Sequence, residues 1–158
     1  DVNGMNEMSR QGDRVVVDAF VKLSRSGEVE LDVADCPDLV PPLAAMAAVR
    51  EGTARIVHAA RLRIKESDRL AAVTTAMNAL GAQIEELSDG LVIRGVETLR
   101  GGVSVDACND HRIAMMTAVA ATRCTQPVTI TGAECVKKSY PNFWEDYEML
   151  GGVITREG

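Results

Sequence analysis

The sequence predicts an α/β (α+β) fold built from repeated units, and three observations favour it. Apolar residues recur with helical spacing in five segments, and short β-branched runs bounded by Gly, Asp or Asn lie between them. The middle part of the sequence also resembles its C-terminal part at a constant offset, which pairs Cys36 with Cys108. Alternating helices and strands indicate a domain in which helices cover a sheet.

The five helical segments are predicted from apolar residues at i, i+3 or i+4, and i+7. Their stripes are Val16, Phe20 and Leu23; Leu43, Met46 and Ala47; Leu70, Val73, Met77 and Leu80; Ile113, Met116 and Ala120; and Phe143, Tyr147 and Leu150. The second helix is expected to begin properly only after Pro42, because a residue that precedes proline avoids the α region. Trp144, with Phe143 and Tyr147, is expected in the core.

Six short runs are predicted to be strands: 29–33, 54–57, 83–86, 91–94, 103–105 and 128–131. Asp89-Gly90 separates the third run from the fourth. We expect a β-hairpin there, because glycine tolerates the positive φ that tight turns need.

The self-similarity predicts a repeat of strand, helix, strand, helix and hairpin. At one offset, Cys36-Pro37-Asp38 aligns with Cys108-Asn109-Asp110, and Lys65-Glu66-Ser67 aligns with Lys137-Lys138-Ser139. We interpret 27–95 and 96–158 as repeat units and 1–26 as the tail of an earlier unit. In that tail, Gln11-Gly12-Asp13-Arg14 precedes a predicted helix, as Glu66-Ser67-Asp68-Arg69 does in the next unit. Since the chain opens on Asp1 without a methionine, we expect one partial domain of a longer protein.

The composition excludes several classes of protein. The 158 residues have a net charge of −6 and are 46% hydrophobic, without an uncharged apolar run long enough to span a bilayer and without a secretion signal. We therefore expect a cytoplasmic protein that does not span a membrane. Because the chain has no block of Lys or Arg, we do not expect it to bind nucleic acid. Four cysteines without a C-x-x-C pair, and two histidines without ligand spacing, predict no metal site.

Charged residues gather just before or at the predicted helix starts, where unpaired N–H groups and the helix dipole favour anions. In the segment 63–70, Arg69 offers a rigid fork for a carboxylate or phosphate and Lys65 a point charge. Ser67 or Asp68 can cap the helix. The alternative interpretation is a solvated helix start with mixed charges.

Three further candidates have ordinary structural alternatives. His111 beside Arg112 is a ligand candidate, but a histidine at a helix start is more often a surface or capping residue. Lys138, in the segment 137–141, could belong to a solvated lysine pair. Asp38 could simply be an N-cap carboxylate.

The segments 63–70, 109–112 and 137–141, together with 9–13 and 35–41, resemble the C-terminal part of the EPSP synthase family. The resemblance implies a longer protein with two domains, each of three βαβαββ units in an inverse α/β barrel-like arrangement. Its active site lies in the cleft where helix N-termini converge. The N-terminal domain, and part of the site with it, would be missing here.

The resemblance also implies a reaction. The enolpyruvyl group of phosphoenolpyruvate (PEP) moves to the 5-hydroxyl of shikimate 3-phosphate through a tetrahedral intermediate, with release of phosphate and without a cofactor. Asp38 would be the base near the hydroxyl. Glu66 would exchange a proton with the PEP methylene carbon, with Lys138 as a further candidate for proton transfer.

Substrate binding is implied for the remaining candidates. Arg69, Arg112 and Lys138 would hold the carboxylate and phosphate of PEP, His111 would donate a hydrogen bond nearby, and Lys65 would contact the shikimate ligand. Glyphosate is the inhibitor expected for the whole enzyme. Three alternatives are a relative of UDP-N-acetylglucosamine enolpyruvyl transferase, a non-catalytic anion-binding module and a repeat-built interaction protein.

Overall fold

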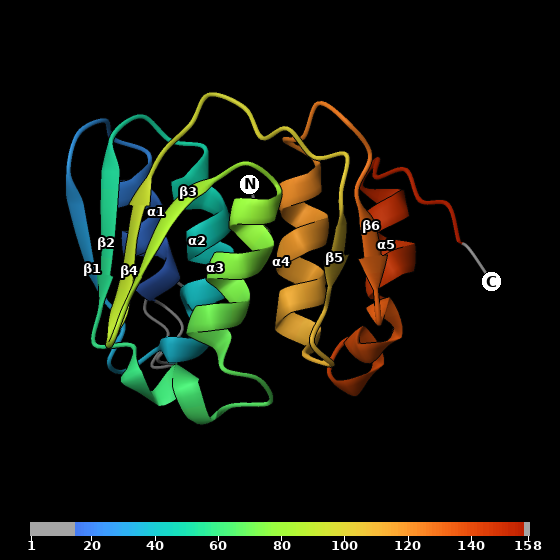
Figure 1. Cartoon of the computed structure of the whole chain (residues 1–158), viewed down its shortest axis with the longest axis horizontal. Helices are drawn as coiled ribbons and strands as arrows, with labels where there is room; N and C mark the ends of the chain where they lie inside the picture. The colour runs from blue at the N-terminus through green and yellow to red at the C-terminus, as the bar shows by residue number, and fades with distance from the viewer. Residues whose placement is uncertain (1–14, 157–158) are drawn as a thin grey trace.

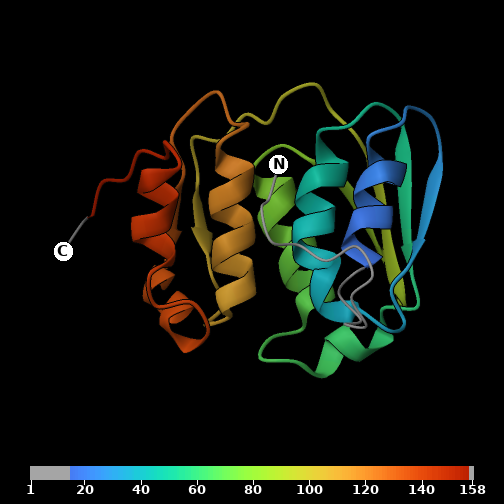
Figure 2. The same cartoon turned by 180° about the vertical axis from the view of Figure 1, so that it is seen from behind.

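A computed structural model describes residues 15–156 (Figures 1 and 2), so the segments 9–13 and 11–14 used in the sequence analysis lie outside the described residues. The helices are α1 (Val15–Leu23), α2 (Val40–Ala48), α3 (Arg69–Ala79), α4 (His111–Ala121) and α5 (Phe143–Met149). The strands are β1 (Val29–Asp32), β2 (Thr53–Val57), β3 (Gln83–Leu87), β4 (Gly90–Arg94), β5 (Ser104–Asp106) and β6 (Thr129–Thr131). Short 3-10 turns are η2 (Pro37–Leu39), η3 (Ala60–Ile64) and η4 (Ala133–Lys138). The predicted fold class is confirmed.

The strands form two sheets. In the larger sheet the order is β1-β2-β4-β3, with β1 and β2 parallel and β4 antiparallel to both of its neighbours. Helices α1, α2 and α3 pack against this sheet. The smaller sheet pairs β5 with β6 in parallel. Helix α4 follows β5 and packs against α2 and α3, so the two β-α-β segments share one core (Figure 1).

Backbone hydrogen bonds within each repeat unit show which residues of the two units are structurally equivalent. Val33 N donates to Val57 O, and Ala107 N donates to Thr131 O, so Val33 is the structural equivalent of Ala107. The turn in which Cys36 N bonds to Val33 O then corresponds to the turn in which Asp110 N bonds to Ala107 O. Asp110 is therefore equivalent to Cys36. The sequence alignment, which paired Asp110 with Asp38, is wrong by two positions at this turn.

The main core joins the sheet to its helices. Its largest fully buried side chains include Ile56, Leu70, Met77 and Ile93, all from predicted stripes or strands. Phe20 is an exception, because α1 buries Ala19 and Leu23 and leaves the Phe20 ring 59% exposed.

The aromatic residues of α5 lie outside the main core. Phe143 and Trp144 are half-buried and pack against a small separate cluster, with their ring centroids 4.9 Å apart. The expectation that these aromatic residues lie in the core is thus only partly met. Along residues 15–156, no helix combines the length and hydrophobicity needed to cross a membrane.

The predicted hairpin is confirmed, but the reason for its glycine is different. Strands β3 and β4 pair antiparallel, with Leu87 opposite Gly90. Gly90 does not take a positive φ. Instead, a Cβ at this position would lie 2.0 Å from the Ile56 carbonyl oxygen of β2. Glycine is required here because two strands approach closely.

Helix α2 begins earlier than the sequence predicts. It starts at Val40, so Pro41 and Pro42 lie within its first turn. The first N–H groups of a helix have no intrahelical acceptor, so prolines cost no hydrogen bond there. The expected start after Pro42 is wrong for this reason.

Candidate anion-binding site

The charged candidates converge where α3 and α4 begin and where η2 leads into α2. The starts of α2, α3 and α4 lie at the lower ends of the helices in Figure 1. Parallel strands each followed by a helix place the helix N-termini on one side of the fold. Residues far apart in the sequence, such as Asp38 and Arg112, therefore come into contact.

Arg69, the first residue of α3, lies at the centre of this network and is 2% exposed. Its Nε donates to Asp110 Oδ2 at 2.7 Å, and its Nη2 donates to Asp110 Oδ1 at 3.1 Å. Its Nη1 donates to Asp38 Oδ1 at 2.8 Å, and Nη2 also donates to Glu66. One guanidinium thus binds three carboxylates.

Asp38 is an acceptor for three cations and does not cap a helix. Lys65 Nζ lies 3.2 Å from Asp38 Oδ1, and Arg112 Nη2 donates to Oδ2 at 3.3 Å. Arg112 Nη1 also donates to the Asp38 carbonyl oxygen at 3.2 Å. Partial burial favours the neutral acid, but the Lys65 hydrogen bond and the charges of Arg112, Lys65 and Arg69 outweigh it and lower the pKa of Asp38.

Glu66 and His111 face each other beside Arg69. His111 Nδ1 is 3.4 Å from Glu66 Oε1, which is too long for a good hydrogen bond, and this buried nitrogen has no hydrogen-bond partner within residues 15–156. Glu66, Asp110 and His111 offer donor atoms within 4.8 Å of one another, as a metal site does. Both carboxylates already bind Arg69, so the guanidinium supplies the positive charge at this position.

Asp110 is the principal site residue absent from the sequence-based candidates. It is fully buried and accepts hydrogen bonds from Arg69, from Ser67 Oγ at 2.9 Å and from the Arg112 backbone N–H at 3.0 Å. Burial opposes ionisation, but these hydrogen bonds and the Arg69 charge lower the pKa of Asp110 overall. The sequence signal for Asp110 was its place before a predicted helix, which suits an N-cap, and Asp110 is the N-cap of α4.

The segment before α3 is fixed from two sides. Asp68 caps the helix by accepting from Ala71 N at 3.2 Å, which leaves Ser67 for Asp110. Arg63 Nη1 donates to Asp68 and to Glu86 of β3. These contacts anchor the segment that carries Lys65 and Glu66 to the hairpin.

Lys138 lies next to the network without joining it. It ends η4, and its Nζ donates to Asn109 Oδ1 at 2.8 Å and to the Asn109 carbonyl oxygen. The structure therefore brings together six of the seven predicted residues: Asp38, Lys65, Glu66, Arg69, His111 and Arg112.

The charges of this network balance. Three cations, Lys65, Arg69 and Arg112, face three carboxylates, Asp38, Glu66 and Asp110. An incoming anion must therefore draw these cations away from carboxylates that hold them, with Lys138 as an additional cation at the edge.

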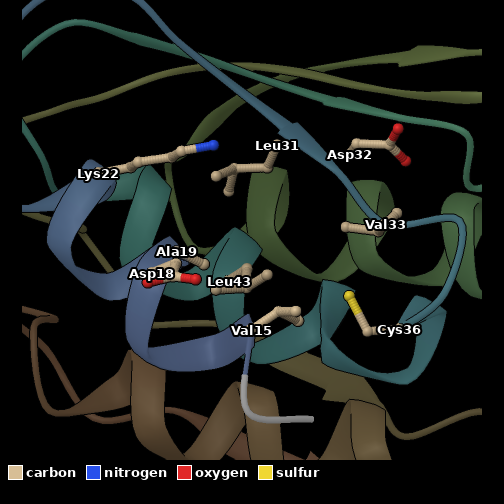
Figure 3. Close-up of a pocket in the computed structure, with 9 residues that line it drawn as sticks. All are labelled: Val15, Asp18, Ala19, Lys22, Leu31, Asp32, Val33, Cys36 and Leu43. Atoms are coloured by element: carbon tan, nitrogen blue, oxygen red, sulfur yellow. The ribbon is translucent and has the colours of Figure 1, made fainter. Parts of the chain in front are cut away.

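A separate hollow of about 180 Å³ lies between α1, β1 and α2 (Figure 3). Its lining mixes aliphatic side chains with Asp18, Lys22, Asp32 and Cys36. None of the network residues lines it, so the converging helix starts, and not this hollow, form the candidate site.

Comparison with known proteins gives a consistent result. A family model described as EPSP synthase (3-phosphoshikimate 1-carboxyvinyltransferase) matches residues 4–147. The chain is 51% identical over 163 residues to a 3-phosphoshikimate 1-carboxyvinyltransferase from Clostridium acetobutylicum, and 49% identical over 166 residues to one from Clostridium kluyveri. These matches cover 95% and 96% of this chain but only 38% and 39% of the relatives.

A solved structure described as EPSP synthase from Acinetobacter baumannii matches with a TM-score of 0.70 and 30% identity. That match covers 92% of this chain and 30% of the solved chain. This chain therefore corresponds to well under half the length of the proteins it resembles.

Proposed function

This chain belongs to the EPSP synthase family, and we propose that its network of cations and carboxylates forms one side of a site for enolpyruvyl transfer from PEP to shikimate 3-phosphate. One observation carries the proposal. Asp38 and Glu66, two carboxylates suited to proton transfer, are bound to the same buried guanidinium of Arg69, with Lys65 and Arg112 beside them. The reaction needs acid–base groups and cations for an anionic substrate in one place.

The proposed chemistry is an addition to PEP followed by an elimination. The 5-hydroxyl oxygen attacks C2 of PEP, its proton goes to a base, and C3 gains a proton to become a methyl group. The tetrahedral intermediate then loses phosphate from C2 and a proton from C3. The product is the enolpyruvyl ether together with inorganic phosphate.

Asp38 is proposed as the base for the hydroxyl. In the structure its three cationic partners hold it as a weak base, because they favour its ionised form. PEP brings a carboxylate and a phosphate that compete for Arg69 and Arg112. As these cations turn to the substrate, the proton affinity of Asp38 rises, so substrate binding itself prepares the base.

Glu66 is proposed to exchange the proton with C3, since it binds a different nitrogen of the guanidinium from Asp38. His111, whose Nδ1 has no hydrogen-bond partner among residues 15–156, is available to a substrate oxygen. Lys138 is proposed to reach the PEP phosphate from the edge of the site, and Lys65 the shikimate ligand.

We expect the 158-residue chain to bind PEP weakly and to show no turnover. The relatives are more than twice as long, and positioning of both substrates is proposed to need their additional residues. Amide chemical shifts followed during a PEP titration will report binding near Arg69 and Arg112. Robust product formation by this chain alone, or an unperturbed spectrum, contradicts this expectation.

The activity itself is tested in a chimera in which this chain replaces the matching segment of the Clostridium acetobutylicum relative. Phosphate release is measured with PEP and shikimate 3-phosphate. Asp38→Asn and Glu66→Gln should each lower the rate by about two to four orders of magnitude, the range for general acid–base groups. Glu85→Gln, on the exposed face of the hairpin, is the matched control and should leave the rate unchanged. A folded chimera without activity, or full activity in either variant, refutes the assigned roles.

A further inference from the structure

The side chain of Asp110 contacts groups at the start of α3 and at the start of α4. It lies at the N-cap of α4 and binds Arg69 and Ser67 from the start of α3. Helices α3 and α4 lie side by side (Figure 1). The Asp110 side chain joins their N-terminal ends by hydrogen bonds. No water-exposed atom of Asp110 is available for substrate, because the residue is 0% exposed.

The geometry of the guanidinium explains what this contact does. Asp110 occupies the Nε–Nη2 edge of Arg69 with two hydrogen bonds. That leaves Nη1 and the second Nη2 hydrogen directed at Asp38 and Glu66. A planar fork held by one edge has its remaining donors fixed in direction, which a single hydrogen bond cannot achieve.

The same carboxylate also orients the neighbouring cation. Asp110 Oδ1 accepts the Arg112 backbone N–H, which fixes the first turn of α4 that carries the Arg112 and His111 side chains. Asp110 Oδ2 accepts from Ser67 Oγ, which fixes the position of Ser67 next to Glu66. All four hydrogen bonds therefore set positions of groups that face the site.

We propose that Asp110 is a positioning residue: it holds the Arg69 fork and the α4 start so that the N–H groups of Arg69 and Arg112 that now bind Asp38 and Glu66 can be taken over together by one anionic ligand. This inference rests on the proposed function, because it assigns Arg69 and Arg112 to PEP. Asp110 does not touch substrate. Its carboxylate balances the buried Arg69 charge, so that this arginine can stay in place before any ligand arrives.

The test uses Asp110→Asn in the full chain. The amide keeps an oxygen that can cap α4, but places an N–H₂ group against the arginine donors. Two measurements are made: the ¹H–¹⁵N resonance of Arg69 Nε–H without ligand, and PEP affinity from amide shifts. We expect the Nε–H resonance to move and to exchange faster with water, and PEP affinity to fall about tenfold or more.

Two control variants separate positioning from general destabilisation. Asp106→Asn alters a nearby exposed carboxylate, which accepts a bond from Cys108 N and does not contact Arg69. Asp68→Asn, at the N-cap of α3, keeps an oxygen that can cap the helix and removes the charge that pairs with Arg63. Both should leave the Arg69 Nε–H resonance in place. If Asp110→Asn does not fold, Asp110→Ser is used, which keeps a cap oxygen and introduces no opposing N–H₂ group.

The outcomes are distinguishable. An unchanged Arg69 Nε–H resonance in a folded Asp110 variant overturns the inference, and so does a moved resonance with wild-type PEP affinity. If the wild-type chain fails to bind PEP while Asp110→Asn still releases Arg69, the proposed function fails and the structural half of the inference stands alone; the claim about ligand positioning is then rejected.

Discussion

Removing the Arg69 guanidinium should destabilise the fold far more than removing a surface charge. In Arg69→Gln, Asp110 remains a buried carboxylate that has lost its cation. Breaking a buried ion pair from one side typically costs about 3 to 5 kcal/mol. Asp110 keeps its hydrogen bonds from Ser67 and the Arg112 N–H, so we expect the lower end, about 3 kcal/mol.

The remaining partners of Arg69 add little to this figure. Asp38 and Glu66 have side chains 36% and 40% exposed, so water replaces the lost hydrogen bonds. A domain of this size is stable by about 5 to 15 kcal/mol, so Arg69→Gln should still fold. With a urea slope of about 2 kcal/mol per molar, the unfolding midpoint should fall by about 1.5 M.

The assay is urea unfolding followed by circular dichroism, with two comparison variants. Arg55→Gln disrupts an exposed pair with Glu30 at 4.0 Å and should leave the midpoint unchanged. Arg69→Gln combined with Asp110→Asn removes the unpaired charge and should be more stable than Arg69→Gln alone. A midpoint shift below about 0.3 M for Arg69→Gln, or a double variant less stable than the single one, refutes the reasoning.

Three other predictions follow from the structure. The pKa values of Asp38 and Asp110 are lower in the folded chain than in the unfolded one, so both stabilise the fold above the ordinary carboxyl pKa of about 4. The urea midpoint should therefore fall as pH drops below about 4, and Asp38→Asn should weaken that fall; a flat profile counts against the ion pairs. Gly90→Ala should lower the thermal midpoint strongly because of the Ile56 carbonyl, whereas Gly151→Ala, with a φ of +99° and no atom within 4 Å of the new Cβ, should cost only about 1 to 2 kcal/mol. Equal effects would contradict the close approach. Cleavage after the exposed Glu97 should leave the two pieces associated on gel filtration, because α4 packs against α2 and α3 of the N-terminal piece. Separate elution of the two pieces would contradict this packing.

Local patterns predicted most of the fold. The stripe Leu70, Val73, Met77 and the hairpin at Asp89-Gly90 depend on side-chain period and turn chemistry, which are visible in a sequence. The reason for Gly90 was not visible, because the obstructing Ile56 carbonyl belongs to β2, a strand that is distant from Gly90 in the sequence. The exposure of Phe20 likewise depends on what packs against α1.

The residues of the candidate site were predictable, but the network of contacts among them was not. Charges at helix starts identified Arg69, Arg112 and their neighbours, and the resemblance supplied proposed roles. Asp110 was overlooked because an aspartate at an N-cap has an ordinary explanation, and only the approach of α3 to α4 gives it a second partner. The correspondence between the two repeat units was similarly not visible. The sequence alignment matched Asp110 with Asp38, whereas the backbone hydrogen bonds make it the structural equivalent of Cys36.

The half-buried position of Trp144 has a practical consequence for optical measurements. It is the chain's one tryptophan, and it lies on α5, against Ala133 and the small cluster rather than the main core. Its emission therefore reports on the α5 end of the molecule, while far-ultraviolet dichroism averages over all helices. Comparing the two signals during denaturation reveals whether that end melts together with the large sheet or ahead of it.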